Sequence, residues 1–139
     1  MQGQCECGEV GYRLTGDDAS IVYACHCLAC QRTSGSAFAL YAFASAESFI
    51  VEGETAAFDP GAGRAVRHFC ASCGTGLYRI NAALPGFVIL HAGTMEQADR
   101  IMPAAHIWTR RKQAWIALPE GVPTWPKNPT PEEFAAAVL

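Results

Sequence analysis

Hydrophobic and polar positions alternate over short stretches of the chain, and this pattern predicts mostly β-strands. In Glu9–Leu14, for example, Val10, Tyr12 and Leu14 would share one face of a strand. Further stretches rich in aromatic and β-branched residues are Ser20–Ala24, Ala37–Phe43, Ser48–Glu52, Ala65–Phe69, Leu77–Ile80, Phe87–His91, His106–Thr109 and Ala114–Leu118. Because glycine and proline punctuate them, we predict a mainly β fold of short antiparallel strands.

Two helices are predicted beside these strands. A short helix should cover Leu28–Thr33, directly after a cysteine-rich stretch. Near the C-terminus, Thr130 is suited to cap a second helix, Pro131 to begin it, and Glu133 to complete a capping box. The sequence therefore predicts a short C-terminal helix on a mainly β domain.

A third short helix is indicated after Thr94, where Gln97 stands at the capping-box spacing. Pro103 limits it to two turns. No repeat, linker or low-complexity block divides the chain. We therefore interpret residues 1–139 as a single domain.

Length and charge narrow the class of protein. The chain has 139 residues, of which 50% are apolar, and this is enough for one packed core. Its net charge of -3 and lack of a basic run argue against binding to nucleic acid or anionic membranes. The sequence has neither an apolar run that could span a bilayer nor the features of a secretory signal. We therefore expect a cytoplasmic protein, whose thiols stay reduced.

Cysteine is the most informative residue type in this chain. There are seven cysteines, an odd number, so they cannot all pair within the molecule. Cys5 and Cys7, like Cys25 and Cys27, are too close in sequence to form unstrained disulfides. Tight cysteine clusters in a reducing compartment are typical of metal sites. We therefore predict metal ligands in preference to disulfides.

The first cysteine constellation combines Cys5 and Cys7 with Cys70 and Cys73. A CxxC followed by glycine forms a zinc knuckle, in which Gly74 would permit the tight turn. Two such pairs would join the N-terminus to a late hairpin through one zinc ion. Four thiolates make a closed structural site that contributes to folding. The alternative, a redox-active CxxC, does not account for the paired cluster at the N-terminus.

The second constellation consists of Cys25, Cys27 and Cys30. Residues 25 and 27 would lie on one face of a strand, and a turn would bring residue 30 back toward them. His26 would fall on the opposite face. The sequence therefore supplies three zinc ligands here and leaves the fourth position to be identified.

Two kinds of ligand could fill the fourth position. His91, His106 or an acidic side chain would close the site, whereas water or substrate would leave it open, as in catalytic zinc sites. Three thiolates give the zinc complex a net charge of -1, so the metal is a weak Lewis acid that favours a fourth, soft sulfur ligand. We therefore hypothesise that the missing ligand is an exogenous thiol, which the metal would deprotonate.

The cysteines lie in motifs that resemble those of a known family. These motifs are GxCxCGxVxY (Gly3–Tyr12), CHCxxCQRxxGS (Cys25–Ser36), RxFCxxCGxxL (Arg67–Leu77), AGT (Ala92–Thr94), PxxHIW (Pro103–Trp108) and Trp115 near PEGVPTWP. Together they resemble the glutathione-dependent formaldehyde-activating enzyme family, which also contains the centromere protein V group. The similarity extends from residue 3 to about residue 126 and includes all seven cysteines.

This resemblance implies an Mss4-like fold with two zinc ions. The implied structural zinc ligands are Cys5, Cys7, Cys70 and Cys73, and the implied catalytic zinc ligands are Cys25, Cys27 and Cys30. The implied activity is a carbon–sulfur lyase reaction run in reverse, in which glutathione and formaldehyde give S-hydroxymethylglutathione. Residues 127–139 lie beyond the shared motifs as a C-terminal extension.

Glutathione carries two carboxylates, so its site should contain cations. Arg32 is the candidate, whereas Arg110–Lys112 is expected to be solvated surface charge. His106 is either a general base near the metal or a buried residue of an aromatic strand. The aromatic residues expected in the core are Phe69, Trp108, Trp115 and Trp125.

The main alternative to an enzyme is a non-catalytic zinc-binding protein or an interaction module of the same fold. The chain lacks a basic extension, which argues against a cytoskeletal partner. Methionine sulfoxide reductases share the fold and a four-cysteine zinc, but need a reactive cysteine late in the chain. No cysteine follows Cys73. A small thiol is therefore the expected partner, with the oligomeric state left open.

Overall fold

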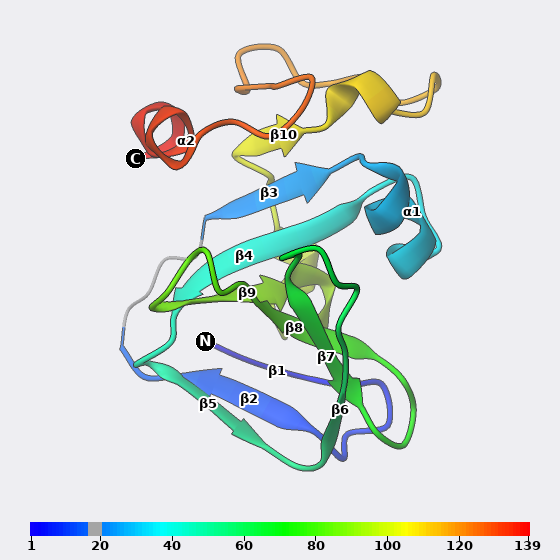
Figure 1. Cartoon of the computed structure of the whole chain (residues 1–139), viewed down its shortest axis with the longest axis vertical. Helices are drawn as coiled ribbons and strands as arrows, with labels where there is room; N and C mark the ends of the chain where they lie inside the picture. Colours follow the sequence, from blue (N-terminus) through cyan, green and yellow to red (C-terminus); the bar gives the residue numbers. More distant parts are fainter. Residues whose placement is uncertain (17–20) are drawn as a thin grey trace. The chain divides into compact units, whose positions relative to one another are not determined.

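The computed structural model of the chain describes residues 1–16 and 21–139 (Figure 1). It is mainly β and contains two compact units. The first unit combines the described part of Met1–Ser20 with Ala42–Ile101, and the second combines Ile21–Tyr41 with Met102–Leu139. The predicted mainly β fold is confirmed, while the single-domain interpretation stays a prediction.

A three-stranded antiparallel sheet opens the first unit. Its strands are β1 (Gln2–Gln4), β2 (Gly11–Leu14) and β5 (Phe49–Glu52), in the order β1-β2-β5. In β2, the side chains of Tyr12 and Leu14 are buried and that of Arg13 is exposed, as the alternation of the sequence predicts.

The first unit also contains a run of four antiparallel neighbours. In spatial order these are β9 (Phe87–His91), β8 (Gly76–Ile80), β7 (Val66–Cys70) and β6 (Thr55–Phe58). Leu77 and Leu90 are fully buried and centre the core of this unit. The strand β7 ends at Cys70, so the sheet positions the first cysteine of the pair Cys70 and Cys73. The strand β4 (Ala39–Ser45) begins in the second unit and ends in the first.

The second unit is built around a parallel strand pair. The strand β3 (Val22–Cys25) lies beside β10 (Ala105–Ile107), with His106 opposite Ala24 (Figure 1). This pair corrects the prediction of a purely antiparallel architecture. Parallel neighbours need a long crossover connection, and periodicity within each strand carries no information about it. The helix α1 (Leu28–Ser34) follows β3, and the predicted short helix at this position is confirmed.

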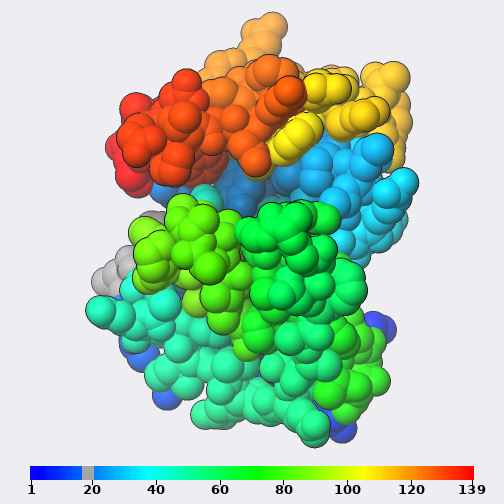
Figure 2. Space-filling model, viewed as in Figure 1, coloured from blue at the N-terminus to red at the C-terminus, as the bar shows by residue number. Residues whose placement is uncertain are grey.

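The helix α2 (Pro131–Val138) confirms the predicted C-terminal helix and its capping box. Glu133 N donates to the Thr130 hydroxyl at 3.1 Å, and Thr130 N donates to the Glu133 carboxylate at 2.8 Å. Phe134 packs against Tyr23 and Trp125, with ring centroids 5.5 and 5.9 Å apart. Figure 2 shows this helix, in red, on the surface beside the orange segment that precedes it.

Within its described residues, the structure contains two strands that were not predicted and lacks one that was. The strands Gln2–Gln4 and Thr55–Phe58 were not predicted, because they are short and lack strong alternation. Ala114–Leu118 is not a strand, since the Lys112 ammonium donates to the carbonyl of Ile116 at 2.7 Å and fastens a turn. The expected strand start at Ser20 lies outside the described residues.

Short 3₁₀ helices replace two other predicted elements. The helix expected after Thr94 is instead two turns, η1 (Ala92–Thr94) and η2 (Ala98–Arg100). The Thr94 hydroxyl donates to the carbonyl of His91 at 2.7 Å, so it does not act as a helix cap. The strand predicted to reach residue 109 ends at Ile107 and is followed by η3 (Thr109–Arg111).

The aromatic residues expected in the core differ in their burial. Phe69, Trp108 and Trp125 are half-buried, but Trp115 is 74% exposed, which contradicts the expectation for that residue. Trp115 lies in a turn and not in the predicted strand, so it does not face the core as an alternating strand residue would. Among the described helices, none has the length and hydropathy that crossing a membrane would need.

Candidate metal centres and substrate pocket

The four cysteines of the first cluster converge in the first unit. The sulfur atoms of Cys5, Cys7, Cys70 and Cys73 all lie within 4.8 Å of one another. The Sγ atoms of Cys5 and Cys7 are 3.5 Å apart, and those of Cys7 and Cys70 are 3.8 Å apart. Four sulfurs at a zinc–sulfur distance of 2.3 Å would be separated by about 3.8 Å. All seven cysteines are free, so the spacing fits a tetrahedral metal and not a disulfide.

Local backbone geometry explains why these thiols converge. Gly74 follows the CxxC pair with φ of 76°, a left-handed conformation that suits glycine and allows the tight turn. Backbone N–H groups point at the sulfurs: Val10 N lies 3.3 Å from the Cys5 Sγ, and Cys73 N lies 3.5 Å from the Cys70 Sγ. Such donors stabilise thiolates, the form that binds a metal.

Polar contacts join the N-terminal cysteine loop to the CxxC turn. Glu6 N donates to the Thr75 hydroxyl at 3.2 Å, and the Ser72 hydroxyl donates to the Glu9 carboxylate. The Thr75 hydroxyl also lies 3.1 Å from the Cys73 Sγ and lowers the pKa of that thiol to about 6. The predicted juxtaposition of the N-terminus with a late hairpin is therefore present, and its donor set fits zinc.

The second cluster lies in the second unit, where β3 leads into α1. Cys25 ends β3, Cys27 caps α1, and Cys30 lies in the first turn of that helix. Their sulfur atoms are within 4.8 Å of one another. Cys30 N donates to the Cys27 Sγ at 3.3 Å, which holds the loop in this geometry. Strand, cap and first turn together present three sulfurs to one point.

Hydrogen bonds within the second cluster favour negative charge on one of its sulfurs, that of Cys27. Hydrogen bonds from the Cys25 and Cys30 thiols hold the pKa of Cys27 far below its usual range. The same contact with Cys27 raises the pKa of Cys25. The Tyr41 hydroxyl lies 3.3 Å from the Cys30 Sγ in the buried part of the site. Tyr41 was not identified from the sequence, because it follows Cys30 by eleven positions and lies in β4, outside the cysteine motif.

His26 turns away from the cysteines, as strand alternation predicts. Its Nε2 atom lies 3.0 Å from the Nδ1 atom of His106, and the two rings stack with centroids 5.3 Å apart. His26 is 0% exposed and His106 is 6% exposed. Burial lowers the pKa of His26 to about 4 and also lowers that of His106. Both rings are therefore neutral at pH 7.

Within the described residues of the second unit, no histidine or carboxylate joins the three sulfur atoms as a fourth ligand. His106 lines neither of the two pockets described below. A substrate contact for His106 stays a prediction. The cluster itself offers three donors from this unit, which is the arrangement expected for a site with an open position.

A pocket of about 510 Å³ opens beside the helix α1, which contains Cys30 and is capped by Cys27. It is lined by Leu28, Gln31, Arg32, Gly35, Ser36, Ala37 and Gln113. Leu28 and Gln31 directly follow Cys27 and Cys30 in the sequence. Arg32, the cation proposed from the sequence, is exposed in this pocket.

Gln31 connects the cysteine loop to the segment after β10. Its side-chain amide donates to the carbonyls of His26 at 2.8 Å and Arg111 at 2.9 Å. Its carbonyl oxygen accepts from Gln113 Nε2 at 3.3 Å. Gln31 belongs to the CHCxxCQR motif, so its position beside Cys30 was a usable signal. Nothing in the sequence indicated Gln113.

Basic residues gather near this pocket. Arg110 and Arg111 are exposed, as expected for surface charge, and the carbonyl of Arg111 meets Gln31. Lys112 is instead half-buried, with its ammonium on backbone carbonyls. A carboxylate-bearing ligand would find an accessible guanidinium at Arg32.

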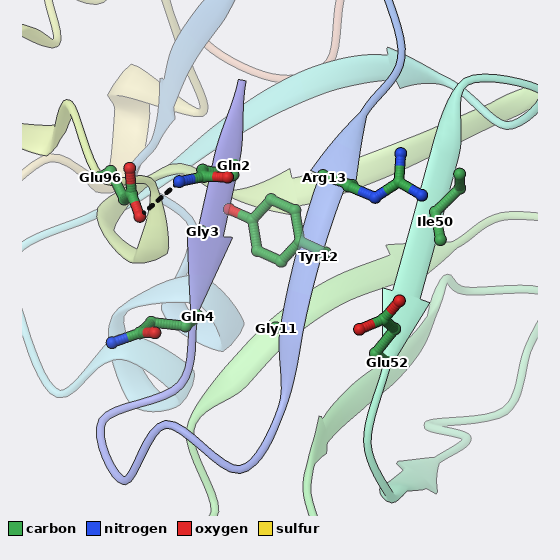
Figure 3. A pocket seen from close by; sticks show the side chains of 9 residues that line it. All are labelled: Gln2, Gly3, Gln4, Gly11, Tyr12, Arg13, Ile50, Glu52 and Glu96. Atoms are coloured by element: carbon green, nitrogen blue, oxygen red, sulfur yellow. Dashed lines mark hydrogen bonds between the residues drawn. The ribbon is translucent and has the colours of Figure 1, made fainter.

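A smaller pocket of about 240 Å³ lies over the three-stranded sheet of the first unit (Figure 3). Its polar lining includes Arg13, Glu52 and the pair Gln2 and Glu96, joined by a hydrogen bond of 2.8 Å. Charges of both signs face it and none of the seven cysteines lines it. It offers no thiol chemistry and is not the candidate site.

Comparisons with known proteins indicate the family of the chain. A family model described as "Glutathione-dependent formaldehyde-activating enzyme" matches residues 1–111. A Halomonas elongata protein named "Putative glutathione-dependent formaldehyde-activating enzyme" is 24% identical over 126 residues, which cover 85% of this chain and 80% of the relative.

A crystal structure of a Rhodobacter sphaeroides protein has a similar fold. Its TM-score is 0.57 and its identity 23%, and the match covers 74% of this chain and 98% of that protein. At this identity the likeness establishes the fold alone. The family match, by contrast, includes both cysteine clusters, and on that evidence the chain belongs to the glutathione-dependent formaldehyde-activating enzyme family.

Proposed function

We propose that the protein is a zinc-dependent enzyme of the carbon–sulfur lyase type that adds a small thiol to formaldehyde. With glutathione, the product would be S-hydroxymethylglutathione. The observation that carries this proposal is the three-sulfur cluster of Cys25, Cys27 and Cys30 beside a pocket that contains Arg32. Membership of the family supports the choice of glutathione and formaldehyde.

The donor set of the second cluster suits a thiol substrate. A zinc ion on three thiolates would accept a fourth sulfur and hold it deprotonated. In the reaction, the thiolate sulfur attacks the carbonyl carbon and a carbon–sulfur bond forms. The carbonyl π bond breaks, and its electron pair moves to the oxygen, which takes up a proton. No oxidant or reductant is needed.

The residues of the chain bind and orient the thiol. The Arg32 guanidinium would hold a substrate carboxylate through two parallel hydrogen bonds. Leu28 and Ala37 provide an apolar wall of the same pocket. Gln31 bonds to the cysteine loop and to the pocket residue Gln113. It therefore holds the loop and this side of the pocket at a constant separation.

The first cluster would hold a zinc ion with a different role. Cys5, Cys7, Cys70 and Cys73 fill all four tetrahedral positions, so the site would be closed to substrate. We infer that this zinc is structural and joins the N-terminal strands to β7.

The first test is metal content together with thiol binding. We expect two zinc ions per chain, one for each cluster. In cobalt-substituted protein, glutathione should change the visible spectrum of the wild type but not of Cys27→Ser. Arg32→Ala should weaken glutathione binding, whereas Arg110→Ala, which removes an exposed arginine outside the pocket lining, should not.

A positive result would be followed by an assay of glutathione and formaldehyde consumption against the uncatalysed rate. Two zinc ions with a cobalt spectrum indifferent to every thiol would contradict the proposal. The second site would then be closed, and the protein would be a non-catalytic zinc-binding protein.

A further inference from the structure

Trp115 is an exposed indole held in place next to the pocket of the second unit. The side chain is 74% exposed. Its Nε1 donates to the Gln113 Oε1 at 2.6 Å, and Gln113 lines the pocket. Because the indole is exposed, burial contributes little to holding it in place. A hydrogen bond fixes its position instead.

A chain of hydrogen bonds connects Trp115 to the cysteine loop. Gln113 donates to Gln31, and Gln31 donates to the carbonyl of His26, which lies between two cysteines of the cluster. The turn itself is fastened by Lys112, whose ammonium donates to the carbonyls of Gln113 and Ile116 at 3.3 and 2.7 Å. The indole is therefore part of a connected polar network and not an isolated surface residue.

The pocket has two chemically different sides. Arg32 offers a cation for a carboxylate. Leu28, 42% exposed, and Ala37 offer apolar contact. The exposed indole of Trp115 lies just outside this lining, held against Gln113 at its edge by a hydrogen bond. A ligand that uses both sides carries a carboxylate and a planar body several atoms long. A peptide-sized thiol meets this description, because its amide planes can stack on an indole, whereas a bare mercaptan does not.

We infer that Trp115 is a specificity-determining residue, which packs against the body of a carboxylate-bearing thiol peptide. This inference rests on the proposed function, since it assigns the substrate class of the same site. Trp115 selects the larger thiol and Gln113 positions the indole. The sulfur-binding cluster accepts large and small thiols alike.

The test compares glutathione with 2-mercaptoethanol in cobalt-substituted protein. Trp115→Ala should weaken glutathione binding roughly three- to tenfold, the range expected for one aromatic contact, and leave 2-mercaptoethanol binding unchanged. Met102→Ala is the matched control, because Met102 is also an exposed large apolar residue of the second unit, whereas the hydrogen bond to the pocket residue Gln113 belongs to Trp115. Glutathione should also change the tryptophan fluorescence of the wild type more than that of Trp115→Phe.

A double-mutant cycle tests the role of Gln113. If Gln113 positions the indole, Trp115→Ala with Gln113→Ala should lose no more glutathione affinity than the larger single loss. Equal glutathione affinity in wild type and Trp115→Ala, with both thiols still binding, would overturn the inference and leave the proposed function intact. A wild-type cobalt spectrum unaffected by either thiol would instead overturn the proposed function.

Discussion

Cys7 and Cys27 have the same side chain but connect parts of the chain at very different separations. The Cys7 sulfur contacts that of Cys70, 63 positions later, and so joins the N-terminus to β7. Cys27 joins residues of a single strand–turn–helix segment that its backbone hydrogen bonds already hold. A metal that closes a long loop removes more entropy from the unfolded chain than one that closes a short loop.

Serine substitutions should therefore separate the two clusters. Cys7→Ser and Cys73→Ser are expected to unfold or aggregate the protein. Cys27→Ser should remain folded with about half of the zinc, since one of two clusters is lost. Thermal melts by circular dichroism and metal analysis would measure both effects. Equal loss of folding in all three variants would contradict the assignment of different roles.

His91 is a histidine whose environment opposes protonation. Burial, and then the positive charges of Arg79 and Arg67, lower the pKa of His91 to about 3. Arg79 Nε donates to the His91 Nε2 at 3.3 Å, so the neutral ring serves as an acceptor. In the unfolded chain, a histidine takes up a proton near pH 6.5.

The stability of the protein should therefore decrease as the pH falls from about 6.5 toward 3, because the unfolded chain binds a proton that the folded chain does not. Between pH 7 and pH 5, His91 alone should lower the free energy of unfolding by about 2 kcal/mol. The variant His91→Gln keeps an acceptor for Arg79 but does not titrate, so it should lack this pH-dependent contribution. Urea denaturation of the wild type and His91→Gln at pH 7 and pH 5 measures this difference. Protonation of the thiolates affects both proteins equally and cancels in the comparison. An identical pH dependence would show that His91 does not titrate in this way.

At the scale of the element, α2 depends on its ends and on one side chain. A helix of eight residues is marginal in water, so its capping box and the packing of Phe134 against Tyr23 and Trp125 must stabilise it. The exposed Leu139 adds nothing to this packing.

Thr130→Ala should destabilise α2 by about 1 kcal/mol, because the amide of Glu133 loses its acceptor. Thr130→Ser retains the hydroxyl and should behave as the wild type does. Amide hydrogen exchange at Phe134, whose N–H bonds to the Thr130 carbonyl, would report the change. The same exchange rate in Thr130→Ala and wild type would mean that packing alone holds the helix.

Local patterns predicted the elements that depend on neighbours in sequence. Alternation located β2, β5 and β9, and the capping box located α2, because each is determined within a few residues. Cysteine spacing likewise grouped the seven thiols into the two clusters that the structure brings together.

At the scale of the whole molecule, features built from distant segments could not be predicted. The contact between His26 and His106 spans 80 positions, and the parallel pairing that creates it leaves no local pattern. Gln113 and Trp115 acquire a role only because β10 and η3 bring their turn to Gln31. The exposure of Trp115 was mispredicted for the same reason, since an aromatic residue in an apolar run resembles a core residue.

The two segments of the second unit flank most of the first unit in the sequence. During synthesis, all seven cysteines and the whole of the first unit are therefore translated before Met102–Leu139. All four cysteines of the first cluster are then in place while β10 and the pocket residue Gln113 are still missing. A nascent chain that ended at Ile101 would already contain every cysteine of both clusters and yet have no finished pocket, so metal loading marks an early stage of maturation and not its completion.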